Sequence, residues 1–108
     1  MNTVTQLSVL DLQKLLLSEQ DLILLDVREL AEYQIARIEN SLLIPLGQLS
    51  NNLTKLAREQ PLAVICHHGI RSQQAAEYLA FCGFSQVYNV SGGIDAWSLQ
   101  CDKSVSRY

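Results

Sequence analysis

Short continuous runs of apolar residues recur along the chain and predict buried strands. Such runs are typical of strands that are covered on both faces of a parallel sheet. They comprise residues 22–27, 42–44, 62–66 and 87–90. Pro45 ends the second run, because proline has no N–H group to donate to a neighbouring strand. The pattern therefore predicts several short strands that run through the interior of one domain.

Apolar residues at helical spacing predict helices between these strands. Ser8 is a suitable N-cap for a first helix, and residues 28–34 predict one or two helical turns. Leucines at 46, 49, 53 and 56 predict an amphipathic helix. A further predicted helix ends at Gly83, and a final short one carries Trp97. Strands and helices in alternation predict an α/β domain with a mostly parallel central sheet.

Composition and charge fit a single globular domain over residues 1–108. The chain is 48% hydrophobic and 18% charged, which excludes a disordered or fibrous protein. Eight Lys and Arg residues against 11 Asp and Glu residues give a net charge of −3, so nucleic-acid binding is not expected. Residues 102–108 either pack Tyr108 back onto the domain or form a loose tail.

Three cysteines at 66, 82 and 101 show no CxxC spacing, which argues against a disulfide framework or a zinc knuckle. A reducing compartment is the simpler interpretation. The first residues show no secretion signal, and no apolar run is long enough to span a bilayer. We therefore expect a cytoplasmic protein that does not bind membranes, with a monomer as the default oligomeric state.

Residues directly after strands are the candidates for chemistry, because open α/β sheets bind ligands beyond the carboxyl ends of their strands. Residues 26–29 and 66–72 satisfy this condition. The second segment follows the most strand-like run of the chain and opens a predicted helix. It reads Cys66-His67-His68-Gly69-Ile70-Arg71-Ser72.

The predicted position of Cys66 at a helix N-terminus favours its anionic form. Unpaired N–H groups and the positive end of the helix dipole both stabilise a thiolate, which is the reactive form of cysteine. Gly69 allows the loop to curl so that successive N–H groups converge on an anion. Arg71 opposes the helix dipole, at a cost of about 0.3–1 kcal/mol, unless an anion lies beside it, and the Cys66 thiolate, with any anion bound to it, would be that partner. The segment predicts an electropositive cup, to which His67 and His68 can add partial charge.

The spacing of Cys66 and Arg71 bears on the type of cysteine chemistry. Four residues lie between them, whereas the corresponding loops of cysteine phosphatases and arsenate reductases are one residue longer. A shorter loop forms a tighter ring of amides. Such a ring suits one sulfur atom on the cysteine better than a tetrahedral oxyanion, so the loop length favours sulfur transfer.

Four segments together resemble the single-domain rhodaneses, a family of thiosulfate sulfurtransferases, over nearly the whole chain. The loop 66–72 matches in composition and length, and residues 92–97 resemble the family's C-terminal signature. The other two segments are residues 24–29 with Glu32-Tyr33, and residues 38–45. The chain departs from the family at residues 36–38 and 40–41, where Gly-His-Ile and Gly-Ala are usual. These departures affect a turn and leave the cysteine loop intact.

The resemblance implies the three-layer rhodanese-like fold, with a five-stranded sheet flanked by helices, and persulfide chemistry without cofactor or metal. Cys66 would take the outer sulfur of a small anionic donor such as thiosulfate and pass it to cyanide, to a thiol or to a sulfur-relay protein. Arg71 would help to bind the donor. Ser72 would start the helix and hydrogen-bond the cysteine sulfur. The persulfide would be held by the loop backbone, which includes His67, His68, Gly69 and Ile70.

Alternatives remain open for the domain and for single residues. The domain could be a persulfide carrier or sulfur-sensing module that binds partners without turnover, or a small phosphatase or arsenate reductase. Cys66 could be a buried core residue. His67 and His68 could ligate a metal, although adjacent residues converge on one ion only with strain. Asp26 and Arg28 end a strand beside the site, where a structural ion pair competes with an indirect role in catalysis.

Overall fold

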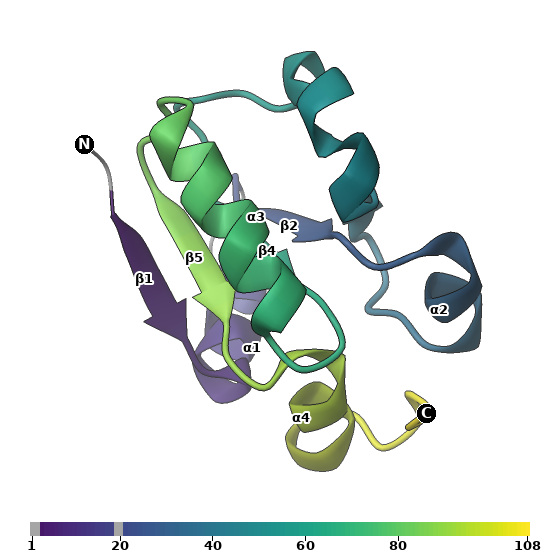
Figure 1. Ribbon diagram of the computed structural model, residues 1–108. Coiled ribbons are helices and arrows are strands. Elements are labelled where there is room, and N and C mark those ends of the chain that lie inside the picture. The colour runs from purple at the N-terminus through teal and green to yellow at the C-terminus, as the bar shows by residue number, and fades with distance from the viewer. Residues whose placement is uncertain (1–2, 19–20) are drawn as a thin grey trace.

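The structure, a computed structural model, describes residues 3–18 and 21–108 and contains a five-stranded sheet. Neighbouring strands pair in parallel throughout, in the order β1-β5-β4-β2-β3. The edge strand β1 and its neighbour β5 lie side by side in Figure 1. The predicted α/β fold with a central five-stranded sheet is confirmed. Residues 1–2 and 19–20 of the predicted domain 1–108 lie outside the described part. The strands are β1 (Val4–Leu7), β2 (Ile23–Asp26), β3 (Leu42–Leu43), β4 (Leu62–Ile65) and β5 (Val87–Val90).

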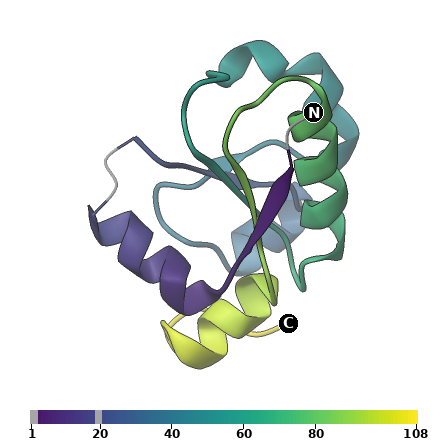
Figure 2. The same ribbon diagram turned by 90° about the vertical axis from the view of Figure 1, so that its left-hand side faces the viewer.

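Helices cover both faces of the sheet, which gives three layers (Figure 2). One face packs against α3 (Ile70–Phe81) and the 3-10 helices η1 (Leu46–Asn51) and η2 (Leu53–Lys55), and the other against α1 (Val9–Ser18) and α4 (Gly93–Gln100). Helix α2 (Leu30–Ile35) follows β2. In the described part of the chain, none of the helices has the length and apolar character needed to cross a membrane.

Strand β4 shows why its sequence is apolar at every position. Leu62 and Val64 point into the core beneath α3, whereas Ala63 and Ile65 point into the core beneath α1 and α4. Successive side chains of a strand face opposite sides of the sheet, so a central strand that is covered on both faces needs no polar positions. Cys66 follows directly at the carboxyl end of this strand.

The hydrophobic pattern did not predict β1, which forms one edge of the sheet. Val4–Leu7 pairs with Val87–Val90 of β5 along its whole length. Within β1 only Leu7 is buried, and Thr5 and Gln6 are exposed. An edge strand with little buried surface does not produce the continuous apolar run by which the central strands were predicted.

The predicted amphipathic helix over residues 46–56 is wrong in type, because the structure forms two short 3-10 helices there. The break falls at Asn52, whose backbone leaves the helical region (φ −127°, ψ 17°) and whose side-chain amide donates to Gln48 O (2.7 Å). Leu49 and Leu56 are buried as the pattern predicted, since three-residue spacing also suits a 3-10 helix. The segment is poor in α-helix formers, with Gly47, Ser50, Asn51 and Asn52.

Residues 102–108 fold back onto the domain. Val105 packs against the core beneath α1 and α4, and its carbonyl accepts a hydrogen bond from Ser98 Oγ (2.5 Å). Tyr108 reaches the cysteine loop and the end of β2. Of the two alternatives for this segment, the structure shows the one in which Tyr108 packs back onto the domain.

Candidate active site

Cys66 lies where β4 passes into the loop that opens α3. Its side chain is only 1% exposed and belongs to the core beneath α3. Sγ accepts a hydrogen bond from Gly69 N (3.0 Å) and donates one to Ser72 Oγ (3.3 Å). The sulfur is therefore covered by apolar side chains but is held by polar groups. Of the loop N–H groups that were predicted to converge on an anion, that of Gly69 contacts Sγ in the described part of the chain.

The first residues of α4 set the orientation of the loop backbone. Ile94 N donates to Cys66 O (2.9 Å), and Asp95 N donates to His67 O (3.2 Å). The C=O and N–H groups of a trans peptide point in opposite directions, so the amides that follow these carbonyls point away from α4. Gly93 permits the close approach, because a Cβ there would overlap Cys66 O and lie 2.5 Å from His67 O. The Gly92-Gly93 pair thus shapes the loop.

We expect Gly93→Ala to disrupt this junction. The added Cβ would displace α4 from the two carbonyls, and the backbone at Gly93 is left-handed (φ +59°), which alanine adopts at a cost. The free energy of unfolding should fall by about 2–3 kcal/mol, and sulfur transfer should fall with it. Urea unfolding and a thiosulfate assay measure both effects.

The matched control for this substitution is Gly47→Ala, where an added Cβ has nothing within 4 Å. Its stability should stay within about 1 kcal/mol of the wild type. Wild-type stability and activity in Gly93→Ala would show that the loop does not depend on the close approach of α4.

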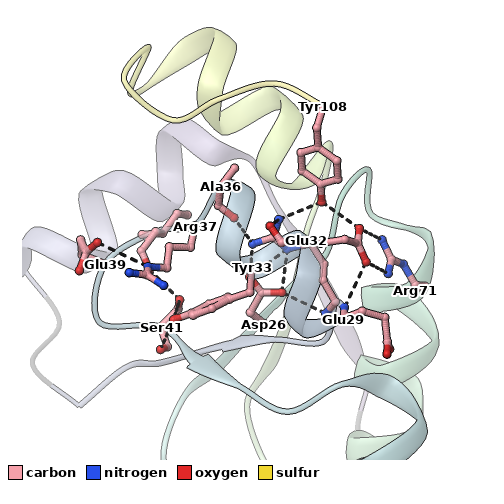
Figure 3. A network of polar contacts seen from close by, with 12 residues as sticks. Asp26, Glu29, Glu32, Tyr33, Ala36, Arg37, Glu39, Ser41, Arg71 and Tyr108 are labelled. Carbon is pink, nitrogen blue, oxygen red and sulfur yellow. Dashed lines mark hydrogen bonds and ion pairs between the residues drawn. The ribbon is translucent and has the colours of Figure 1, made fainter.

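Arg71 forms a two-point ion pair with Glu32 of α2 (Figure 3). Nη1 donates to Oε1 (2.6 Å) and Nη2 to Oε2 (2.8 Å). Hydrogen bonding to Arg71 lowers the pKa of Glu32 to about 2, and the same contact raises the pKa of Arg71. The sequence predicted the Cys66 thiolate, or an anion bound to it, as the partner of Arg71, whereas in the structure Arg71 pairs with the Glu32 carboxylate, which joins α2 to the first turn of α3. About a third of the Arg71 side chain (34%) stays exposed.

Acid should lower the free energy of unfolding of the wild-type protein more steeply than that of a Glu32→Gln variant. The pKa of Glu32 is about 2 in the folded protein, below its usual 4.5, so its contribution to stability is complete above 4.5 and is lost as the pH falls towards 2. Between these two pH values the unfolded chain binds up to one proton more than the folded protein. The free energy of unfolding therefore falls by up to about 1.4 kcal/mol for each pH unit of acidification. Urea unfolding at several pH values measures this slope for both proteins. Parallel curves would contradict the pairing of Glu32 with Arg71.

Asp26 and Arg28 form a buried ion pair, with side chains at most 1% exposed. The guanidinium bonds both carboxylate oxygens at 2.7–3.1 Å, and Arg28 N also donates to Asp26 Oδ1 (3.0 Å). Arg28 further donates to Ala36 O (2.6 Å). Burial alone would lower the pKa of Arg28, but hydrogen bonds to Asp26 and Tyr108 raise it. The geometry agrees with the structural interpretation of both residues.

Tyr108 connects this buried pair to the cysteine loop. Its hydroxyl accepts a hydrogen bond from Arg28 Nη1 (2.8 Å) and donates one to Glu32 Oε2 (2.9 Å). Its ring stacks on that of His67, with centroids 3.9 Å apart and an interplanar angle of 7°. Tyr108 therefore contacts two groups of the site, the His67 ring and the Glu32 carboxylate, which also binds Arg71 (Figure 3).

The two histidines of the loop have different surroundings. The His67 ring lies between the rings of His68 and Tyr108. Burial, and after it the nearby His68, lower the pKa of His67, so His67 is mostly neutral at pH 7 and adds little of the predicted positive charge. His68 is 56% exposed, with Nε2 4.0 Å from Asp95 Oδ2. Among the other loop residues, Gly69 has φ +108° and Ile70 is 76% exposed.

The structure adds Asp95 to the two histidines that were considered as metal ligands. Potential ligand atoms of His67, His68 and Asp95 lie within 4.8 Å of one another. However, Arg107 Nε binds the Asp95 carboxylate (2.9 Å), which places a positive charge where a cation would bind. Chemistry without a metal stays a prediction.

Three residues at the site were given no role by the sequence analysis. Glu32 lies within a recognised motif, but nothing in the sequence indicated Arg71 as its partner. Tyr108 has no local signal, because 80 positions separate it from Arg28. Asn89 had a signal, since it is a polar residue inside an otherwise apolar run. It is buried and accepts a hydrogen bond from Ser72.

Comparison of the chain with known proteins gives matches that agree on one family. The rhodanese-like domain family profile matches residues 8–100. Thiosulfate sulfurtransferase GlpE of Pseudoalteromonas translucida is 33% identical over 92 residues, which cover 85% of this chain and 88% of that protein. The protein of the same name from Pseudomonas savastanoi pv. phaseolicola is 40% identical over 81 residues, which cover 75% of this chain and 76% of that protein.

Solved structures show the same fold. A rhodanese-like domain protein from Staphylococcus aureus superposes with a TM-score of 0.84 and 28% identity, covering 97% of this chain and 99% of that chain. A rhodanese-related protein from Thermoplasma volcanium superposes with a TM-score of 0.81 and 35% identity, covering 90% and 93% of the two chains. The fold, the cysteine loop and these matches agree, and the chain belongs to the rhodanese-like domain family.

Proposed function

We propose that this sulfurtransferase moves a sulfane sulfur from a small anionic donor, such as thiosulfate, to cyanide or a thiol through a persulfide on Cys66. The observation that carries the proposal is the position of Sγ at a strand-to-helix junction, in hydrogen-bond contact with Gly69 N (3.0 Å) and Ser72 Oγ (3.3 Å). The names of the relatives from Pseudoalteromonas and Pseudomonas support thiosulfate as the donor.

The reaction takes place in two balanced steps. The Cys66 thiolate attacks the outer sulfur of thiosulfate, so that a new S–S bond forms and the S–S bond of thiosulfate breaks. Sulfite leaves with the electron pair of that bond. Cyanide then attacks the outer sulfur of the persulfide, thiocyanate departs and the Cys66 thiolate is restored. The covalent intermediate divides one transfer into two easier steps.

The loop residues have separate roles in this proposal. Backbone amides from His67 to Arg71 hold the outer sulfur, and α4 keeps the carbonyls of Cys66 and His67 turned away from it. Arg71 attracts the anionic donor with its exposed part and orders the loop through Glu32. Ile70 and His68 are 76% and 56% exposed, so an acceptor would approach over them.

Burial of the nucleophile supports one alternative function. Cys66 is only 1% exposed, so the groups that cover the sulfur must move before a free donor reaches it. A persulfide carrier that opens only when it binds a partner protein would suit this burial. In either case we propose that the protein is a monomer that needs no cofactor and that it works in a reducing, cytoplasmic compartment. The three cysteines are free thiols in the structure.

Mass spectrometry of the intact protein tests the proposal. After incubation with thiosulfate, the wild-type protein should gain one sulfur atom, and cyanide should remove it. Turnover with cyanide at a rate equal to or above that with a protein thiol supports the enzyme. Transfer only to a protein thiol supports the carrier. Absence of any mass gain, or turnover of an aryl phosphate in its place, would contradict both.

A further inference from the structure

Tyr108 links two ion pairs of the site through its hydroxyl group. Arg28 Nη1 donates to this hydroxyl (2.8 Å), and a guanidinium can only donate. The phenolic proton is therefore directed to Glu32 Oε2 (2.9 Å), and burial raises the pKa of Tyr108, which keeps that proton on the phenol at neutral pH. The same carboxylate binds Arg71 (Figure 3). Hydrogen bonds thus connect the buried guanidinium of Arg28 to the guanidinium of the cysteine loop.

The Glu32 carboxylate is held by contacts from α2, from α3 and from the tail. Oε1 accepts hydrogen bonds from Glu29 N (3.1 Å) and Arg71 Nη1 (2.6 Å). Oε2 accepts hydrogen bonds from Arg71 Nη2 (2.8 Å) and from the Tyr108 hydroxyl. The contact within α2 restrains Oε1 alone. Without the phenol, the carboxylate would be free to turn about Oε1 and to take the Arg71 guanidinium with it.

The direction of the Arg71 guanidinium bears on how it meets an anion. The guanidinium carries more N–H donors than the two that bind Glu32, and about a third of the side chain is exposed (34%). These further donors lie in a rigid plane, so their direction follows from the direction of the Glu32 carboxylate. A guanidinium that is already oriented loses less conformational entropy when it binds an anion, and therefore binds it more tightly.

Helix α4 supports the tail that brings Tyr108 to this position. Ser98 Oγ donates to Val105 O (2.5 Å), and Val105 packs against the core beneath α1 and α4. The Tyr108 ring also stacks on the His67 ring. This stacking needs the ring but not the hydroxyl, so the two contacts of Tyr108 can be separated by substitution.

We propose that Tyr108 is a positioning residue that acts through Glu32 to hold Arg71 in the orientation that binds the anionic sulfur donor. The inference rests on the proposed function, because it takes Arg71 as the group that binds the donor. It adds to the site a residue outside positions 8–100, the part of the chain that the family profile matches.

Tyr108→Phe tests the proposal, because it removes the hydroxyl and keeps the ring. Intact-mass spectrometry gives the rate of sulfur loading at increasing thiosulfate concentrations. The concentration that gives half the maximal rate should rise about fivefold, the size expected for the loss of one hydrogen bond. The maximal loading rate should stay within about twofold of the wild type, and so should the rate at which dithiothreitol, an uncharged thiol, removes the sulfur from the loaded protein.

Two comparisons decide whether the effect passes through Arg71. Tyr88→Phe is the matched control, because it removes a hydroxyl that accepts a hydrogen bond from Gln86 Nε2 (2.7 Å), and its loading should equal that of the wild type. In an Arg71→Ala background, loading at one low thiosulfate concentration should be the same with and without Tyr108→Phe, since substitutions that act through one group are not additive. An equal effect of Tyr108→Phe in both backgrounds would overturn the proposal.

Urea unfolding of the same proteins separates positioning from a purely structural role. A lower stability of Tyr108→Phe with an unchanged half-maximal thiosulfate concentration would assign the hydroxyl a structural role and overturn the proposal. If the wild type gains no sulfur, the proposed function fails. If the wild type loads sulfur and Tyr108→Phe loads it at the same thiosulfate concentrations, this inference alone fails.

Discussion

Cys66→Ser should gain no sulfur from thiosulfate, and its turnover should fall by at least about a thousandfold. The substitution keeps a small side chain beside Gly69 N and Ser72 Oγ. It replaces the sulfur nucleophile by an alcohol that is not ionised at neutral pH and forms no persulfide. Intact mass after incubation with thiosulfate gives the loading, and thiocyanate formation gives the turnover.

The other two cysteines provide matched controls for this substitution. Cys82 packs against the core beneath α3. Cys101 Sγ donates to Val9 O (3.4 Å), and burial raises the pKa of its thiol, which makes it a poor nucleophile at neutral pH. Cys82→Ser and Cys101→Ser should therefore load sulfur like the wild type. Retained loading in Cys66→Ser, or its loss in Cys101→Ser, would assign the persulfide to a different residue.

Asp26→Asn should lower the free energy of unfolding by about 3–5 kcal/mol, a large part of the total of a domain of this size. The variant keeps the shape of the side chain but leaves the Arg28 guanidinium, which is fully buried, without its counter-charge. Breaking a buried pair from one side is costly because the remaining charge stays desolvated. Urea unfolding monitored by Trp97 fluorescence measures the loss.

The exposed pair between Arg37 and Glu39 is the control for burial. Its side chains are 47% and 84% exposed, and the two charges lie 3.7 Å apart. Glu39→Gln should change the free energy of unfolding by less than about 1 kcal/mol, since water screens such a pair. Equal losses in Asp26→Asn and Glu39→Gln would show that burial does not set the strength of the Asp26–Arg28 pair.

The central strands were predictable because burial on both faces requires consecutive apolar residues. Residues 62–65 of β4 are all buried, and the sequence there is apolar without interruption. The edge strand β1 was not predictable, because its place depends on pairing with β5 and little of it is buried. At residues 46–56 the leucine spacing indicated the buried face correctly. It did not distinguish an α-helix from two 3-10 turns.

The part of the site that was predicted is local in sequence. Cys66, Gly69, Arg71 and Ser72 lie within one strand-loop-helix junction, and their spacing indicates what they do. Glu32 and Tyr108 reach the loop from distant parts of the chain, and only the fold shows that they meet Arg71 and His67. Local spacing therefore predicted a candidate nucleophile and its loop, whereas the surrounding contacts depend on tertiary structure.

The hydrogen bonds from Ile94 and Asp95 to the carbonyls of Cys66 and His67 have a consequence for protein synthesis. On the ribosome, the cysteine emerges before the residues that shape its loop. A nascent chain that stops short of Gly93 would carry the thiol on a peptide free to rotate, with no donor on either carbonyl. Competence for sulfur chemistry is thus acquired only after α4 has been synthesised and has docked on the loop.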